Sequence, residues 1–298
     1  MNGVITVYKE QDYTSFDVVA IMRGILHEKK IGHGGTLDPK AEGVLPVFIG
    51  SATKLCDFLP YDDKCYEAEL TLGLETDTED IWGVPVSEKE VNVTEEEVRE
   101  AIGSFLGGYE QIPPMYSAKK LNGKKLYELA RKGEIVERKP EHVEIRSIRI
   151  DAVVLPKVRF TVACSKGTYI RTLCADIGKK LGTGGCMSAL KRVRHGIFTA
   201  ESAYRISEIE EAVKNGKTEE ILRPVESLFP EDPALYLKPE FDAALQNGNK
   251  LKSEMIEKIE EGTDSGRFRV YASDGSFRAV YGYDAAEAVY KPLKMFLN

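Results

Sequence analysis

One short stretch, residues 31–46 (IGHGGTLDPKAEGVLP), constrains the fold of this chain more than any other. Four glycines crowd it, and glycine is costly in conformational entropy unless the backbone needs unusual dihedral angles or close approach. Pro39 follows Asp38 and biases its backbone toward an extended conformation, which fixes the direction of the carboxylate. His33 lies between two glycines, unlike a histidine on an ordinary apolar face. A loop that positions one carboxylate indicates a functional site rather than a linker.

Two other interpretations of this loop can be weighed from its residues alone. A phosphate-binding glycine loop is excluded by spacing, since the stretch has neither the Walker pattern nor a strand-borne GxGxxG. A tight structural turn, in which Asp38 caps the backbone, stays open as the alternative.

Regular elements are predicted on both sides of the loop. The β-branched residues 3–8 predict a strand, and the apolar period of residues 15–30 predicts a helix with Thr14 or Ser15 as its N-cap. Residues 44–49 predict a buried strand. The glycine loop is therefore expected to be held between regular elements.

Residues 64–73 (KCYEAELTLG) alternate as a strand does. One face of this strand collects the apolar residues, which are Tyr66, Ala68, Leu70 and Leu72. A tyrosine at the start of such a row is usually a packed residue with a bonded hydroxyl, and that interpretation is open for Tyr66.

A surface helix and a basic segment are predicted next. Thr94 and Glu97 form a capping-box pattern for a helix over residues 94–106. Residues 112–133 begin with two prolines and then mix basic residues with tyrosines, as a groove that follows a nucleic-acid backbone would. An exposed basic loop and helix is the alternative.

A second chemically informative position is Arg171. Residues 143–155 and 158–164 predict two strands, and a helix is expected to follow with Thr168 as its N-cap. Arg171 then falls in the first helical turn, where the helix dipole disfavours a cation by up to about 1 kcal/mol. It should therefore have an anionic partner, for which Asp38 is the candidate. An ordinary exposed helix arginine is the alternative.

The character of the chain changes after residue 233. Residues 184–198 predict a further strand with a basic face, and the segment up to Pro230 is expected to be helical. Beyond it, two strand patterns flank Asp274-Gly275, which is a strong hairpin signal, and residues 288–296 can form another strand. A small β-rich domain is therefore expected at this end.

Composition limits the classes of function. The net charge of −7 is unusual for a nucleic-acid binder, but residues 75–100 carry ten acidic side chains whereas residues 157–195 carry nine basic ones and a single acidic one. This segregation favours a polyanion-facing surface backed by an acidic one, with scattered solvated charges as the alternative. Five scattered cysteines without a CxxC pair argue for a reducing cytoplasm and against a zinc site. The chain contains no apolar run that could span a membrane.

The motifs themselves resemble a known family. Residues 32–39 (GHGGTLDP), continued by residues 43–54 (GVLPVFIGSATK), are similar to the signature of the TruB family of tRNA pseudouridine synthases. Residues 64–78 resemble the family's second motif and residues 166–172 (KGTYIRT) its third. The resemblance covers nearly the whole chain. It implies an α+β fold, in which a mixed, mainly antiparallel central sheet is flanked by helices, the pseudouridine synthase fold.

The resemblance also implies domains. Residues 1–233 would form the catalytic domain, with an insert at about 112–133 that closes over an RNA stem-loop. Residues 234–298 would form a small PUA-like RNA-binding domain, although the similarity is weaker there.

Catalytic roles follow from the same resemblance. Asp38 would be the essential catalytic carboxylate, and Arg171 would pair with it, keeping it ionised and oriented. Tyr66 would lie against the target base and act as, or relay to, the base that removes the final proton.

Substrate contacts are implied at four further positions. Tyr169 and Leu190 would shape the uracil pocket, and His33 would intrude into the RNA to support the flipped conformation. The family's lysine is matched only by Lys9, whose neighbours depart from the family pattern.

The implied reaction is the isomerisation of uridine 55 in the T loop of tRNA. Uracil is detached from C1′, turned and rejoined through C5, which is itself a carbon nucleophile, so neither a metal nor an organic cofactor is needed. The nucleotide must be flipped out at a cost of a few kcal/mol. Asp38 would either attack C1′ or assist departure of the base through a glycal. The T-arm stem-loop would be the partner of a cytoplasmic monomer that needs no membrane and no obligatory protein partner.

Three alternatives remain open. The chain could be a guide-RNA-dependent synthase, which the basic insert and the lack of long charged tails disfavour. It could act mainly as an RNA-folding chaperone. A generic nucleotide-binding α/β enzyme is disfavoured by the missing phosphate motifs.

Overall fold

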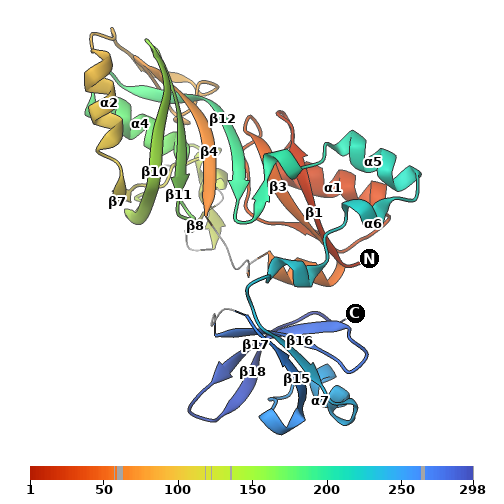
Figure 1. The fold of residues 1–298 in the computed structure, drawn as a ribbon. Coiled ribbons are helices and arrows are strands. Elements are labelled where there is room, and N and C mark those ends of the chain that lie inside the picture. Colours follow the sequence, from red (N-terminus) through yellow and green to blue (C-terminus); the bar gives the residue numbers. More distant parts are fainter. Residues whose placement is uncertain are drawn as a thin grey trace.

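The structure is a computed structural model that describes residues 1–56, 58, 63–117, 119–121, 123–134, 136–262 and 266–297, without the side chains of residues 120, 121 and 125. A large sheet occupies the N-terminal part, and a smaller sheet lies below it in Figure 1. The strands of the large sheet are, in spatial order, β1 (Gly3–Lys9), β3 (Glu42–Ile49), β12 (Gly185–His195), β4 (Lys64–Leu72), β11 (Lys157–Cys164), β10 (Glu141–Val154) and β7 (Gly107–Gln111), with β2 (Ile31–His33) on β3 and β13 (Phe198–Thr199) on β12.

The large sheet is mixed and mainly antiparallel, as predicted. Among the pairs on this path, β3 and β12 run parallel, through the register Lys191 to Glu42 and Arg192 to Gly43. This junction joins the N-terminal strands to the rest of the sheet. It therefore brings the glycine loop, which precedes β3, beside the strand that carries Leu190.

The first helix, α1 (Ser15–Leu26), begins at the predicted N-cap. Thr14 and Asp17 form a capping box, with each side chain accepting a hydrogen bond from the other's backbone N–H. The helix ends four residues before the predicted Lys30, because His27 takes a left-handed conformation with φ 51°. Its apolar face packs on β1 and β3, and the helices α5 (Ile206–Lys214) and α6 (Thr218–Ile221) add to the same core.

The predicted apolar face of β4 is buried, with Tyr66, Ala68, Leu70 and Leu72 all pointing into one core. The helices α2 (Glu95–Gly103) and α4 (Ile170–Lys180) cover that face (Figure 1). Thr94 and Glu97 form the predicted capping box, although α2 ends three residues before the predicted Leu106.

The predicted N-cap of α4 is wrong. Thr168 Oγ1 donates a hydrogen bond to the carbonyl of Ser165 at 2.9 Å, so its side chain is turned into the preceding loop. Tyr169 occupies the N-cap position instead and, within the described residues, its side chain makes no capping hydrogen bond. Arg171 is still in the first turn of the helix, as predicted.

The remaining elements of the N-terminal part are short. They are the hairpin of β5 (Leu74–Thr76) and β6 (Pro85–Glu88), the hairpin of β8 (Lys120–Leu121) and β9 (Lys124–Lys125), and the helix α3 (Leu126–Ala130). The last three elements lie in the predicted insert 112–133, in which residues 118 and 122 fall outside the described residues.

The smaller sheet is built from residues 234–295, inside the range expected for a second domain. Its order is β15 (Ile256–Glu260), β14 (Ala234–Leu237), β16 (Arg267–Tyr271), β17 (Phe277–Asp284) and β18 (Val289–Met295), and α7 (Asp242–Gln246) lies beside it. The predicted hairpin around Asp274-Gly275 joins β16 to β17. Val280 and Phe296 of this part pack in one cluster with Phe48 of β3, so the two sheets share a core.

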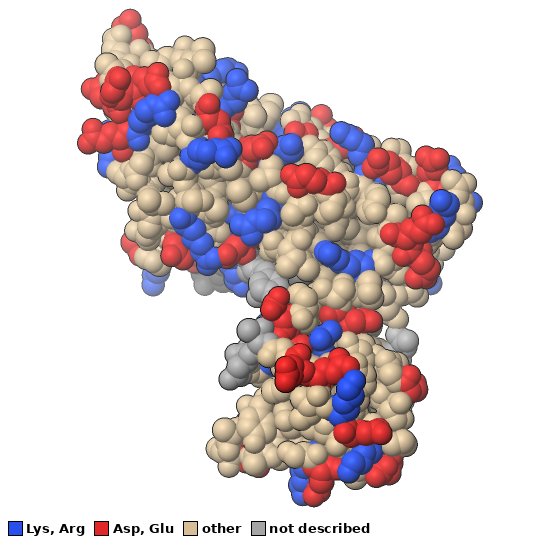
Figure 2. Space-filling view, viewed as in Figure 1, with Lys and Arg blue, Asp and Glu red and all other residues tan. Residues whose placement is uncertain are grey.

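Basic and acidic groups are intermingled on the face seen in Figure 2. The basic segment 157–195 supplies strands that flank the acidic residues of β4. Lys157 therefore lies 2.8 Å from Glu69, and Lys191 lies 3.7 Å from Glu67. In the described parts of the chain, no helix has the length and apolar character needed to cross a membrane.

Candidate active site

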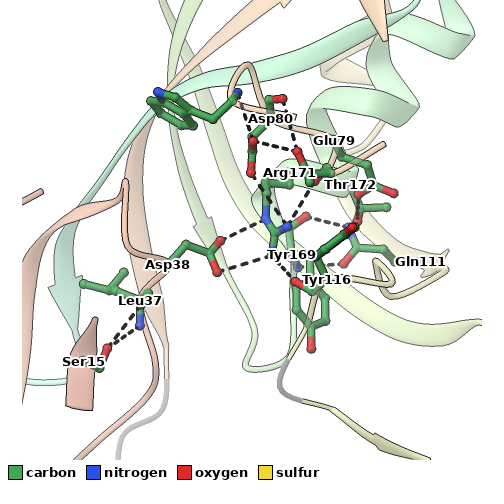
Figure 3. Close-up of polar contacts among 12 residues, drawn as sticks. Ser15, Leu37, Asp38, Glu79, Asp80, Gln111, Tyr116, Tyr169, Arg171 and Thr172 are labelled. Atoms are coloured by element: carbon green, nitrogen blue, oxygen red, sulfur yellow. Dashed lines mark hydrogen bonds and ion pairs between the residues drawn. The ribbon is translucent and has the colours of Figure 1, made fainter. Parts of the chain in front are cut away.

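The carboxylate of Asp38 faces the guanidinium of Arg171 through two contacts (Figure 3). Arg171 Nε lies 2.9 Å from Oδ2, and Nη2 donates to Oδ1 at 3.3 Å. The arginine side chain is only 5% exposed, whereas that of Asp38 is 40% exposed. The predicted pair is therefore present, and it is a two-point contact that fixes the direction of a carboxylate still open to solvent.

Arg171 is held by more than Asp38. Its Nη1 donates to the carbonyl of Thr78 at 3.1 Å, and its Nη2 donates to the carbonyl of Tyr116 at 2.8 Å. Asp80 Oδ2 lies 3.9 Å from Nη1. Three separate loops thus converge on one buried cation, whose five N–H donors suit such a site.

The turn after β5 contributes two acidic residues that sequence reasoning missed. Burial raises the pKa of Asp80 and the pKa of Glu79. Thr172, on α4, donates to Glu79 at 2.6 Å, so the turn is bound to the helix that carries Arg171. These residues belong to the acidic segment 75–100, for which the sequence predicts an acidic surface, and no local pattern in it separates these two half-buried side chains from the exposed ones.

The Asp38 loop is fastened from several sides. Leu37 N–H donates to Ser15 Oγ at 2.9 Å at the start of α1, and Ala41 N–H donates to the Asp38 carbonyl at 3.1 Å. Lys9 Nζ donates to the carbonyl of Pro39 at 3.1 Å. These hydrogen bonds fix the backbone of the loop and therefore the position of the Asp38 carboxylate.

Lys9 is a fully buried lysine at the end of β1. Burial lowers its pKa to about 8, and the charge of Asp38 opposes that shift. Because its ammonium bonds the loop backbone at Pro39 and Glu10, Lys9 supports the loop and is not among the described residues that line the cavity beside Asp38.

A cavity of about 280 Å³ opens beside Asp38. Ligand pockets start at about 300 Å³, so this space suits one nucleotide better than a large ligand. The cavity is lined by Gly35, Thr36, Leu37, Asp38, Lys64, Tyr66, Ser117, Lys119, Gly167, Thr168, Tyr169, Ile170, Arg171, Leu190 and Arg192. It thus brings together five of the predicted site residues: Asp38, Tyr66, Tyr169, Arg171 and Leu190.

Tyr169 is positioned through its backbone. Its N–H donates to Gln111 Oε1 at 2.7 Å, and its carbonyl accepts from Gln111 Nε2 at 3.0 Å (Figure 3). Gln111 is buried at the end of β7. This exchange orients the first turn of α4 toward the cavity.

Tyr66 on β4 and Arg192 on β12 both line the cavity. Arg192 is buried, donating from Nε to the carbonyl of Val44 at 2.8 Å and from Nη2 to the carbonyl of Gly35 at 3.0 Å. It also hydrogen-bonds the side chain of Tyr66, but burial outweighs that contact and raises the pKa of Tyr66 to about 12. Arg192 was missed, although it lies two positions after Leu190 and therefore on the same face of a strand.

His33 does not line the cavity among the described residues. It ends β2, where it pairs with Val47 of β3, and its Nδ1 is buried without a hydrogen-bond partner in the described structure. Burial and the charge of Arg192 lower its pKa, which favours a neutral ring.

Comparison with known sequences identifies the class of protein to which this fold and site belong. The sequence model described as "TruB family pseudouridylate synthase (N terminal domain)" matches residues 23–170, and that described as "tRNA pseudouridylate synthase B C-terminal domain" matches residues 171–230. The chain therefore belongs to the TruB family of pseudouridylate synthases.

Individual relatives extend the match over the full length. The chain is 51% identical to tRNA pseudouridine synthase B of Lachnoclostridium phytofermentans, with all of both chains covered. It is 45% identical to the protein of that name from Clostridium tetani, over 92% of this chain and 93% of the relative.

Solved structures support the fold. The chain resembles one in a crystal structure of a Cbf5-Nop10-Gar1 complex, with a TM-score of 0.74 at 26% identity, over 99% of this chain and 85% of the other. A chain in an H/ACA RNP bound to a substrate RNA gives a TM-score of 0.73 at 25% identity, with the same coverage. The predicted pseudouridine synthase fold is thus confirmed.

Proposed function

We propose that this protein converts uridine to pseudouridine in tRNA, at position 55 of the T loop, after flipping the nucleotide out of the folded loop. The observation that carries the proposal is the open carboxylate of Asp38, held by Arg171 at the edge of a cavity of nucleotide size. The relatives named tRNA pseudouridine synthase B support tRNA as the substrate.

Asp38 is the chemical group in this proposal. Its carboxylate either attacks C1′ as uracil leaves, or assists departure while the sugar loses its 2′ proton to give a glycal. Deuterium at C2′ of the target uridine separates the two routes. A primary isotope effect on turnover of the deuterated RNA indicates the glycal route, because only that route breaks the C2′–H bond.

Tyr66 lies against the uracil and relays the final proton. Because its pKa is raised to about 12, its hydroxyl is protonated at neutral pH, and it acts as a neutral phenol rather than as a phenolate base. Tyr169 and Leu190 enclose the freed uracil so that it can turn without escaping.

The flanking parts of the chain serve RNA binding in this proposal. The insert at about 112–133 supplies Ser117 and Lys119 to the cavity edge, which fits a role in closing over the stem-loop. Residues 1–233 act as the catalytic domain, and the sheet in residues 234–298 acts as the PUA-like domain. His33 supports the flipped RNA conformation from the end of β2.

The decisive experiment is tritium release from C5-labelled uridine in a tRNA transcript, with the purified chain and no additives. We expect multiple turnovers with the wild-type protein on a T-arm hairpin, since RNA loops are recognised by shape and by splayed bases. Asp38→Asn should bind the same hairpin and release no tritium. Near-normal turnover by Asp38→Asn would show that the Asp38 carboxylate is not the catalytic group.

The same assay tests the guide-RNA alternative. The structural neighbours include chains from complexes with Nop10 and Gar1, so a requirement for such partners has to be examined directly. If the lone chain is inactive on bare tRNA and active only with added protein and guide RNA, the alternative replaces the proposal.

A further inference from the structure

Trp82 is the single tryptophan of the chain, and 44% of it is exposed. Its neighbours Ile81, Val84 and Val86 are also exposed, so an apolar strip runs along the hairpin of β5 and β6. A large aromatic side chain left open at the surface is a frequent contact residue, because it offers much binding area at low conformational cost.

The turn that presents Trp82 is tightly bonded. The backbone N–H of Trp82 donates to Asp80 Oδ1 at 3.1 Å, and the N–H of Ile81 donates to the carbonyl of Met187 on β12 at 2.9 Å. Thr78 Oγ1 donates to Asp80 Oδ1 at 2.8 Å. The indole therefore projects from a fixed support.

This support is joined to the candidate active site. The carboxylate that accepts the Trp82 N–H at Oδ1 approaches Arg171 Nη1 at 3.9 Å with its Oδ2. On the opposite side, Lys40 follows Asp38 by two positions, and its Nζ lies 6.0 Å from the centre of the indole ring. Trp82 thus follows Asp80 by two positions, as Lys40 follows Asp38. Asp80 and Asp38 are the two carboxylates beside Arg171.

We propose that Trp82 and Lys40 form a stacking platform for an unpaired base that flanks the target uridine, with the Lys40 ammonium placed against the phosphate backbone. The inference rests on the proposed function, since it takes RNA as the ligand. Flipping one nucleotide breaks its stacking with its neighbours, and an exposed indole beside the site restores such a contact for the adjacent base. The platform accepts any base, because every base has a π-face.

Lys40 supplies a cation beside the indole, as contact with a phosphate backbone requires. Lys40 is 43% exposed at the side chain and lies 2.5 Å from Asp12, which is itself 71% exposed. An exposed ion pair of this kind is weak, so a phosphate can take over the ammonium at little cost.

The single tryptophan makes the inference directly measurable. The Asp38→Asn protein is titrated with a T-arm hairpin while its indole emission is recorded. This variant is used because, in the proposed function, it binds the RNA without converting it. We expect saturable quenching of Trp82 emission, with its half-maximal value at the dissociation constant measured independently by filter binding. Binding of the hairpin with unchanged emission overturns the platform and leaves the proposed function intact.

Kinetics give the second readout. Trp82→Ala should raise KM for the hairpin about tenfold while kcat at saturating RNA stays near wild type, and Trp82→Phe should restore most of the loss because it keeps a ring. Lys40→Ala should lower the slope of log Kd against log salt by about 0.7. The matched control is Val86→Ala, an exposed apolar change on the same hairpin, which should leave KM unchanged.

The outcomes separate the two proposals. If the wild-type protein neither releases tritium nor binds RNA, the proposed function is wrong, and the platform is then wrong as well. Normal wild-type activity with equal KM values for wild type, Trp82→Ala and Val86→Ala defeats the platform alone. A wild-type dimer in light scattering that Trp82→Ala converts to monomer shows that the strip binds a second copy, which also overturns the inference.

Discussion

Lys9 Nζ lies 3.1 Å from the carbonyl oxygen of Pro39, so a buried ammonium fastens the residue that directly follows Asp38. The two residues are 30 positions apart, and this bond ties the end of β1 to the glycine loop. The position of the open carboxylate thus depends on a lysine that does not itself line the cavity.

Lys9→Met should slow turnover and leave the affinity for RNA nearly unchanged. Methionine fills the space but donates no hydrogen bond, so the carbonyls of Pro39 and Glu10 lose their donor and the loop is held less firmly. Single-turnover tritium release and filter binding measure the two effects. A variant with weaker binding and normal kcat would contradict a loop-supporting role.

The same substitution should change the pH dependence of stability. The pKa of Lys9 is about 8 in the folded protein against an ordinary 10.5, so between these pH values the unfolded chain holds a proton that the folded chain has lost. Stability should therefore rise from pH 8 to 10.5, by at most about 3 kcal/mol, and Lys9→Met should lack this rise. Urea unfolding at several pH values checks it, with the exposed Lys252→Met as a control that keeps the wild-type slope.

Arg171→Lys should lower kcat by at least about 100-fold, since an ammonium cannot make a two-point contact with Asp38 while also bonding two carbonyls. The buried carbonyls of Thr78 and Tyr116 would lose donors, which costs about 1–3 kcal/mol of stability. Arg99→Lys, on the exposed face of α2, is the matched control and should change neither quantity. Wild-type kcat in Arg171→Lys would show that the guanidinium fork is dispensable.

The contributions of the Tyr66 ring and of its hydroxyl to catalysis can be measured separately. Tyr66→Phe keeps the ring and should slow tritium release, whereas Tyr66→Leu should also weaken the hold on uracil and be slower still. Because the pKa of Tyr66 is raised to about 12, the wild-type pH–rate profile should show no tyrosine ionisation between pH 7 and about 10. A basic limb in that range that disappears in Tyr66→Phe would indicate a phenolate base.

Gly43→Ala should destabilise the fold by about 3 kcal/mol. The backbone there has φ +108°, and an added Cβ would lie 2.2 Å from the carbonyl oxygen of Arg192 where β3 runs parallel to β12. Gly24→Ala, inside α1 with open space around it, should instead stabilise by up to about 1 kcal/mol. Thermal unfolding of both variants measures the contrast.

Local patterns were sufficient for elements whose signal lies within a few residues. The capping boxes at Thr14 and Thr94 follow from contacts between near neighbours, and the alternation of β4 follows from the two-residue period of a strand. Thr168 shows the limit of such reasoning, because its hydroxyl bonds the carbonyl of Ser165 and the helix begins one residue later than a cap at Thr168 requires.

Long-range pairing explains what the sequence did not reveal. Arg192 belongs to the predicted basic face of its strand, but the parallel pairing of β12 with β3 buries it, and it donates to the carbonyls of Val44 and Gly35. Asp80 lies 3.9 Å from Arg171, which comes from α4, a helix much further along the chain. By contrast, the Asp38–Arg171 pair was predictable, since a cation in a first helical turn needs an anion.

Arg171 meets Asp38 across 133 positions of the chain and meets the carbonyl of Tyr116 across 55. A nascent polypeptide emerging from the ribosome therefore carries its reactive carboxylate long before the cation that orients it has been synthesised. Any truncated product that stops ahead of α4 is chemically incomplete, however well its N-terminal strands have paired.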